Sequence, residues 1–304
     1  MSRVAFLCTF ATAIMKAKKK IKSKKSGRKT WKQRSFLGKI WRVFGIAAVA
    51  IVVLMHVEVL AYKFIFPPVT PLMVKRFNQQ LFQKDRKVNF ERDYVRIEAI
   101  DQNLVNSVVA SEDGNFMHHH GFDIKQLKSS YLENKRGRRI RGGSTISMQT
   151  AKNAFLPHKR SMLRKAVETY FTQLIEWYWG KERIMEVYLN IIEFGDGIYG
   201  CEAASQHYFG HSAARLSKHE AAELAATLPS PLKRNPNHQT PHFKKQTSII
   251  QARATKYGTV RLDKAKEIRE RDKKKGKHDE TIFDFAKWMI NQKEAEKIAS
   301  DEED

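Results

Sequence analysis

The sequence predicts a mainly α-helical protein with one membrane-spanning helix near its N-terminus. An apolar stretch at 43–66 is long enough to cross a bilayer. Apolar residues over 159–193 recur at three- and four-residue spacing, and alternating strand patterns dominate nowhere. With 304 residues and 42% hydrophobic content, the chain can bury one sizeable core in one or two domains.

The excess positive charge is concentrated before the apolar stretch. Residues 1–42 hold 14 Lys or Arg and no Asp or Glu, so this arm carries +14 of the formal net charge of +24. By the positive-inside rule, we expect the arm in the cytoplasm and 67–304 outside the inner (cytoplasmic) membrane. A buried core helix is the alternative for 43–66. A nucleic-acid-binding protein or a membrane-surface adaptor is disfavoured, because the exported part carries only +10.

A second apolar segment, 4–15, precedes the basic run instead of following it. As a signal peptide it has only Arg3 as a positive region and no small-residue cleavage site. The order of charges therefore favours translation from Met15. Cys8 and Cys201 would lie on opposite sides of the membrane, which predicts no internal disulfide and no zinc site.

Helical periodicity continues in the exported part. From Asp101 to Ala110 the apolar spacing places Glu112 at the C-terminal end of a helix with one buried face. Residues 135–141 are too polar for a core and indicate an exposed loop. The expected organisation is a basic arm at 1–42, a transmembrane helix at 43–66, a linker at 67–100, the main domain at 101–245 and a charged extension at 246–304.

Residues 159–193 carry the strongest helical pattern. One predicted apolar face contains Leu163, Val167, Tyr170, Phe171, Leu174 and Tyr178. Gly180 marks a break, and an alanine-rich helix at 220–228 ends at Pro229. Residues 262–304 are dense in Lys, Arg and Glu, which predicts solvated helices and a disordered end.

Two blocks combine residues suited to acid/base chemistry on an anionic substrate. The block 111–123 contains acids, an aromatic residue and three histidines, and the block 141–153 contains a Gly-Gly turn, hydroxyls, an amide and a lysine. A buried glutamate in the first, Glu112, can serve as a general base. Three consecutive histidines point in different directions and do not predict a shared metal site. Further on, Arg164 and Lys165 lie on the same face of a predicted helix as Glu168. These three residues could bind a diphosphate group, or they could form a surface ion pair.

Five ordered blocks between Asn103 and Pro236 carry a family resemblance. They read Glu112-Asp113-x-x-Phe116-x-x-His119-x-Gly121-x-Asp123, Gly142-Gly143-Ser144-Thr145-Ile146-x-x-Gln149-x-x-Lys152-Asn153, Arg164-Lys165-x-x-Glu168, Lys181-x-x-Ile184-x-Glu186-x-Tyr188-Leu189-Asn190, and Ala203-Ala204-Ser205-x-x-Tyr208-Phe209 with Glu220-Ala221-x-x-Leu224-Ala225. This order resembles glycosyltransferase family 51, the peptidoglycan glycosyltransferases. The combination is highly specific, whereas any one block alone is weak.

The resemblance implies a lysozyme-like, bilobed domain with a head and a membrane-touching jaw, acting on lipid II. In the family, the first-block glutamate, here Glu112, takes the proton from the C4 hydroxyl of the acceptor GlcNAc as that oxygen attacks C1 of the donor MurNAc. The configuration inverts, a β-1,4 bond forms and undecaprenyl diphosphate leaves. Glu168 matches the second functional glutamate, which orients cations or holds a divalent ion. No cofactor is required by the resemblance, and Mg²⁺ or Mn²⁺ at Glu168 stays open.

The resemblance also assigns the candidate site. Glu112 and Glu168 are the catalytic candidates. The substrate-binding candidates are Asp113, Phe116, His119, Ser144, Thr145, Gln149, Lys152, Asn153, Arg164 and Lys165. Cations and hydrogen-bond donors among them would neutralise a leaving diphosphate. Met148 replaces a usual glutamine and Thr150 a usual apolar residue, so we expect one polar contact to be missing.

We therefore expect a monofunctional, membrane-anchored enzyme that polymerises glycan strands, since the blocks are not accompanied by transpeptidase motifs. The expected partners are lipid II, the growing strand and the membrane, with cell-wall synthesis or division proteins as further candidates and no nucleic acid. A lytic glycosidase of the same shape is the alternative. It is disfavoured because cleaving a sugar–sugar bond needs no diphosphate-binding cations.

Overall fold

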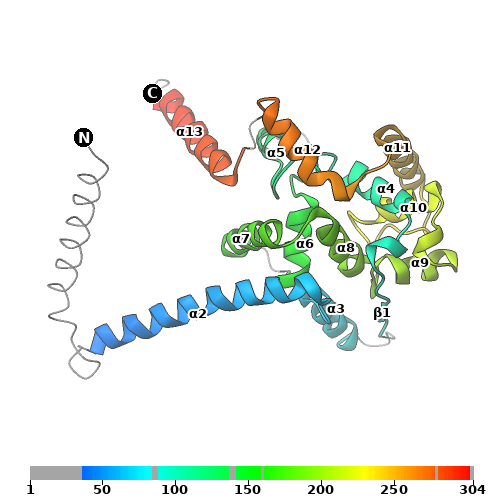
Figure 1. The fold of residues 1–304 in the computed structure, drawn as a ribbon, viewed down its shortest axis with the longest axis horizontal. Helices are drawn as coiled ribbons and strands as arrows, with labels where there is room; N and C mark the ends of the chain where they lie inside the picture. Colours follow the sequence, from blue (N-terminus) through cyan, green and yellow to red (C-terminus); the bar gives the residue numbers. More distant parts are fainter. Residues whose placement is uncertain (1–35, 84–87, 137–141, 159–160, 278–279, 302–304) are drawn as a thin grey trace, which may run out of the picture. The chain divides into compact units, whose positions relative to one another are not determined.

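The computed structural model describes residues 36–83, 88–136, 142–158, 161–277 and 280–301, and it is mainly helical (Figure 1). The α-helices are α2 (Phe36–Phe64), α3 (Pro71–Leu81), α4 (Gln102–Glu112), α5 (Ile124–Lys135), α6 (Ile146–Phe155), α7 (Met162–Tyr178), α8 (Lys181–Ile191), α9 (Cys201–Phe209), α10 (Lys218–Thr227), α11 (Pro241–Tyr257), α12 (Ala265–Lys274) and α13 (Ile282–Asp301). The short elements are η2 (Ile97–Ala99), η3 (Ala213–Arg215), η4 (Leu262–Lys264), β1 (Glu91–Arg92), β2 (Glu193–Gly195) and β3 (Ile198–Tyr199). The predicted fold class is confirmed.

Helix α2 contains the apolar stretch that the sequence indicates. Its segment Gly38–Phe64 has a mean hydropathy of 2.5, and within the described residues it is the one helix long and apolar enough to cross a bilayer. The helix starts before the expected 43–66 and ends just ahead of Pro67. Most of the expected basic arm lies outside the described residues, as do Cys8 and the proposed start at Met15.

The chain divides into two compact units, 1–55 and 56–304. The second unit includes the last turns of α2, which are joined to α7 and the residues after it by polar contacts. The His56 ring hydrogen-bonds to the hydroxyls of Tyr170 and Tyr178, each at 2.8 Å. Trp179 Nε1 donates to the Val59 carbonyl at 2.8 Å. These contacts explain how an apolar helix carries a histidine in its distal half: both ring nitrogens have partners.

The core of unit 56–304 is built from two groups of helices. Helices α4, α10 and α11 pack on one another, and α6 packs against α7 and α8. The predicted apolar face of α4 is buried, with Leu104 and Val108 fully enclosed. Alanines of α10 let it approach α4 closely, and Ser217 and Glu220 form a capping box at its start. The predicted face of α7 is buried only in part, because Leu163 is 76% exposed at its first turn.

A small sheet closes one edge of this core. Its order is β1-β3-β2, with β1 parallel and β2 antiparallel to β3. The turn between β2 and β3 requires glycine at position 197, where φ is +78°. A Cβ there would lie 2.1 Å from the Asn89 carbonyl oxygen, so the close passage of β1 depends on this residue.

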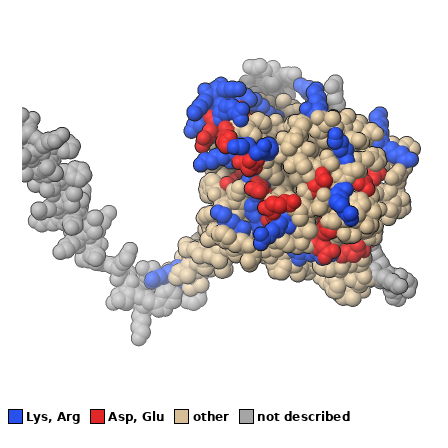
Figure 2. All heavy atoms as spheres, turned by 45° about the vertical axis from the view of Figure 1, so that its right-hand side comes forward, with Lys and Arg blue, Asp and Glu red and all other residues tan. Residues whose placement is uncertain are grey.

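The residues from the end of α11 onward contact α4 and the loop that follows it. Val260 N donates to Asn106 Oδ1 of α4 at 3.0 Å, and the Tyr257 hydroxyl donates to the Gly114 carbonyl at 2.5 Å. Eight of the ten residues of α12 are charged. On the face drawn in Figure 2, Lys and Arg crowd together with Asp and Glu at the upper left of the folded unit. The helices expected in 262–304 are confirmed, and the extreme end, 302–304, lies outside the described residues.

A buried ion pair connects α6, α7 and α8. Lys181 Nζ lies 2.6 Å from Glu176 Oε1, which also accepts from the Ser147 hydroxyl at 2.5 Å. Burial lowers the pKa of Lys181, and Glu176 opposes that shift. Burial raises the pKa of Glu176, but Lys181 and Ser147 more than offset it and leave the pKa below its usual value.

Removing one member of this pair should destabilise the fold. Lys181→Met leaves the Glu176 carboxylate buried without its counterion, and we expect a loss of about 3–5 kcal/mol in the free energy of unfolding. Lys264→Met, which removes an exposed pair with Glu267, should cost less than about 1 kcal/mol. Denaturant unfolding of both proteins in detergent measures the difference, and equal midpoints would contradict it.

Candidate active site

Glu112 ends helix α4, as the periodicity predicts, and its carboxylate is half-buried. Gln149 Nε2 on α6 donates to Glu112 Oε2 at 2.8 Å, and Gln149 Oε1 accepts from the Tyr188 hydroxyl at 3.2 Å. Burial raises the pKa of Glu112, and the Gln149 hydrogen bond and Lys152 oppose it. The result is an oriented carboxylate with raised basicity, as a general base requires.

Asp113 binds the two blocks together. It is 1% exposed and accepts from His119 Nε2 at 3.0 Å and from the backbone N of Ile146 at 3.0 Å. The second bond is made at the N-terminus of α6, where the helix dipole favours a carboxylate. Asp113 therefore positions Glu112 beside α6 and has no surface for a substrate.

Two further candidates lie in the core. The Phe116 side chain is fully enclosed, with the Lys181 ammonium 4.4 Å from its ring centroid. Thr145, also enclosed, caps α6 by accepting from Met148 N and donates to the Gly121 carbonyl at 2.6 Å. By contrast Ser144 is half-buried, and its hydroxyl has no hydrogen-bond partner within the described residues. Among the two hydroxyls, Ser144 is the one available to a ligand.

The second cluster surrounds Glu168 on α7. This carboxylate is 2% exposed and accepts from Arg164 Nη1 and Lys165 Nζ, both at 2.5 Å. Lys152 completes the cluster from α6: burial lowers its pKa, Glu168 raises it, and the adjacent cations lower it again. Glu112 also acts on Lys152, so this lysine links the two clusters electrostatically.

Sequence reasoning missed His158, a residue whose pKa is affected by the cations of this cluster. His158 hydrogen-bonds to Asn153 Oδ1 at 3.1 Å. Burial and the neighbouring cations, Lys152 first among them, lower the pKa of His158 to about 4. The ring is therefore neutral at neutral pH. Tyr188 was also missed as a site residue, although it occupies a fixed position in the fourth block.

A protein-built metal site does not fit these residues. Glu168 has both oxygens bound to cationic side chains. In the described parts of the chain, no three His, Cys, Asp or Glu side chains gather around a common point. His118, His119 and His120 likewise do not form such a group.

The two departures from the family pattern are buried away from Glu112. Met148 packs in an apolar cluster with Phe122 and Ile124. The Thr150 hydroxyl donates to the Ile146 carbonyl in its own helix at 2.9 Å. Met148 thus packs in an apolar environment, where a glutamine would need polar partners. The hydrogen bond of the Thr150 hydroxyl is made within its own helix.

Comparison with known proteins places the chain in a family. The Transglycosylase family model matches residues 78–255. Proteins named biosynthetic peptidoglycan transglycosylase are similar to it: one from Caulobacter vibrioides is 49% identical over 207 residues, covering 68% of this chain and 86% of the relative. One from Aeromonas hydrophila is 42% identical over 208 residues (68% and 87%), and one from Pasteurella multocida 43% over 221 residues (73% and 87%). Because the match spans more than half of the chain and most of each relative, the chain belongs to the transglycosylase family.

Proposed function

We propose that the protein is a membrane-anchored peptidoglycan glycosyltransferase that polymerises lipid II into β-1,4-linked strands, releases undecaprenyl diphosphate and has no transpeptidase activity. The names of its relatives support the reaction class. The observation that carries the proposal is the pairing of an oriented, half-buried Glu112 with a separate cation cluster around Glu168. One side suits a proton acceptor and the other an anionic leaving group.

In this mechanism the Glu112 carboxylate takes the proton from the C4 hydroxyl of the acceptor sugar. The hydroxyl oxygen forms a bond to C1 of the donor sugar from the face opposite the diphosphate. The C1–O bond breaks, and its electron pair stays on the departing diphosphate. Gln149 holds the carboxylate in line through its amide N–H, and Tyr188 holds Gln149.

The leaving diphosphate is stabilised by the cluster on α6 and α7. Lys152, Arg164 and Lys165 supply positive charge, and the Ser144 hydroxyl supplies a donor. Glu168 orients Arg164 and Lys165 through its two oxygens instead of reacting. His119 and Asp113 keep the first block in register with α6, and Phe116 and Asn153 support the two clusters from within the core.

Helix α2 anchors the enzyme beside its lipid-linked substrate. The arm of 14 basic residues before it supports a cytoplasmic N-terminus and an external catalytic unit. Exposed apolar residues at the end of α3, Leu81 and Phe82, support contact of this part of the unit with lipid.

Glu112→Gln should nearly abolish polymerisation. The amide keeps the shape of the side chain but cannot take the acceptor proton, so the rate should fall by about 10²- to 10⁴-fold. Initial rates with labelled lipid II measure the loss. Thermal unfolding and lipid II binding serve as controls and should change little, and wild-type turnover in this variant would assign the base to another residue.

The Gln149–Glu112 hydrogen bond should set the acid limb of the pH profile. The bond favours the ionised carboxylate, so Gln149→Leu raises the pKa of Glu112 further. Activity requires the deprotonated base, and the acid limb of kcat/KM should therefore move to higher pH. Gln251→Leu, on α11, is the matched control and should leave the limb in place. A limb that stays fixed in Gln149→Leu would contradict Glu112 as the titrating base.

A further inference from the structure

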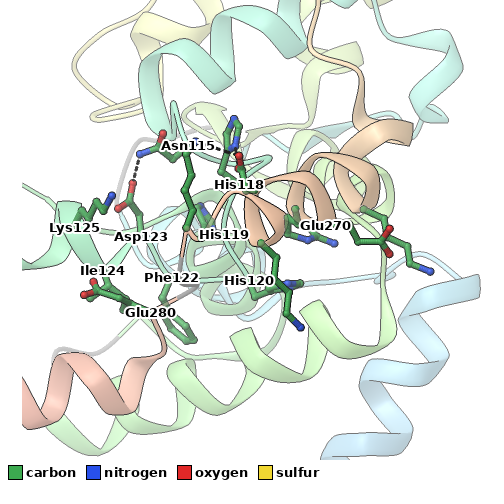
Figure 3. A pocket seen from close by; sticks show the side chains of 16 residues that line it. Asn115, His118, His119, His120, Phe122, Asp123, Ile124, Lys125, Glu270 and Glu280 are labelled. Atoms are coloured by element: carbon green, nitrogen blue, oxygen red, sulfur yellow. Dashed lines mark hydrogen bonds and ion pairs between the residues drawn. The ribbon is translucent and has the colours of Figure 1, made fainter.

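A pocket lies between α12 and the loop that follows α4. It has a volume of about 850 Å³, within the range of about 300–1,000 Å³ typical of ligand sites. Figure 3 shows His118, His119 and His120 on the loop beside α12, with Lys125 and Glu280 at the rim. Since α12 lies beyond residue 255, where the family match ends, the pocket belongs partly to the extension.

Most cations in the wall of the pocket have no counterion within the described part of the chain. Its cations are Lys125, Lys266, Arg269, Lys273 and Lys277. Lys277 pairs with Asp272 at 3.1 Å. Lys125, Lys266 and Lys273 have no hydrogen-bond or ion-pair partner within the described part of the chain.

The acids of the wall are mostly engaged. Asp123 accepts from Asn115 Nδ2 at 2.7 Å and caps α5. Asp272 binds His118 Nδ1 at 2.6 Å. Glu280 binds Lys128 through one oxygen at 2.9 Å, and Glu270 is exposed. The uncommitted groups of the wall are therefore mainly cationic.

Three buried polar atoms of the lining also lack partners among the described residues: His119 Nδ1, Arg269 Nη1 and Glu280 Oε2. His119 is only 5% exposed and its Nε2 bonds to Asp113, so Nδ1 is the ring nitrogen left for a ligand. Arg269 Nη1 is a donor and Glu280 Oε2 an acceptor. Leaving a buried polar group without a hydrogen bond costs free energy. A ligand with both acceptors and donors would therefore fit this pocket.

The pocket lies near the candidate active site, because His119 in its lining bonds to the residue that follows Glu112. Asp113 follows Glu112 in the chain and accepts from His119, which lines the pocket. The loop that bears His119 also carries Phe116. A substituent on a sugar bound at Glu112 would therefore leave the site close to this pocket.

We propose that the pocket binds the peptide arm of the peptidoglycan substrate through its free carboxylates, an inference that rests on the proposed function. Carboxylates would pair with the lysines and Arg269, and a peptide N–H group would donate to Glu280 Oε2. A phosphate has no N–H donors.

The test uses the full chain in detergent and a soluble disaccharide-peptide fragment that cannot be polymerised. Binding is compared for the fragment with free carboxylates, the same fragment with amidated carboxylates, and the disaccharide alone. We expect the free carboxylates to improve affinity by about tenfold, and the advantage to shrink at high salt. Lys266→Glu/Lys273→Glu should abolish it.

Lys274→Glu is the matched control, because Lys274 belongs to the same helix but does not line the pocket. This variant should keep the carboxylate preference. Equal affinity of wild type for the free and amidated fragments, or an equal loss in the control, would overturn the proposal. Competition by inorganic phosphate as effective as that by the peptide would also overturn it, in favour of a general anion site.

The two proposals fail separately. Polymerisation of lipid II by the same preparation tests the catalytic function, whereas fragment binding needs no turnover. Polymerisation without a carboxylate preference would overturn the pocket alone. A carboxylate preference without polymerisation would support the pocket and contradict the catalytic function.

Discussion

The buried carboxylate of Asp113 makes the contacts on which the arrangement of the candidate site depends. It joins the loop after α4 to the first turn of α6 by accepting from His119 and from the backbone of Ile146. Because Asp113 is almost fully enclosed, water does not compete for these bonds. Glu112, the preceding residue, is thereby brought to Gln149 on α6. The Thr145–Gly121 and Gln149–Glu112 hydrogen bonds join the same two blocks on either side of this contact.

Charge is separated across the site in a way that suits its chemistry. Glu112 has a raised pKa because burial disfavours the carboxylate, whereas Glu168 is held between two cations. Lys152 interacts electrostatically with both Glu112 and Glu168. Burial and then the neighbouring cations lower the pKa of His158, so this ring adds no positive charge at neutral pH. A base and a site for an anion can coexist here because each has its own local partners.

The extension after residue 255 is part of the same structure and not an appended tail. Tyr257 bonds to the backbone of Gly114, and a Cβ at that glycine would meet the tyrosine hydroxyl at 2.5 Å. Further along, Phe285 packs beside Phe122 and Met148. Packing thus explains why Met148 occupies a position where the family usually has a glutamine. Its apolar side chain belongs to a cluster that Phe285, in the extension, helps to cover.

The sequence by itself determined the helical class, the membrane-spanning stretch, the position of Glu112 at a helix end and the blocks that identify the family. These properties are local, because they follow from periodicity, spacing and residue type over short windows. It did not separate Ser144 from Thr145, or reveal that Asp113 and Phe116 are enclosed. It also missed His158 and the role of Tyr188.

Only the tertiary structure decided which of these side chains face a cavity and which hold the fold. The Gln149–Glu112 bond joins residues 37 positions apart, and the contact of His118 with Asp272 spans 154. Such contacts depend on how helices pack, and helical periodicity cannot specify a partner on a distant element. For the same reason the charged residues after 255 are predicted to be solvated from the sequence, whereas in the fold they line a pocket together with the loop after α4.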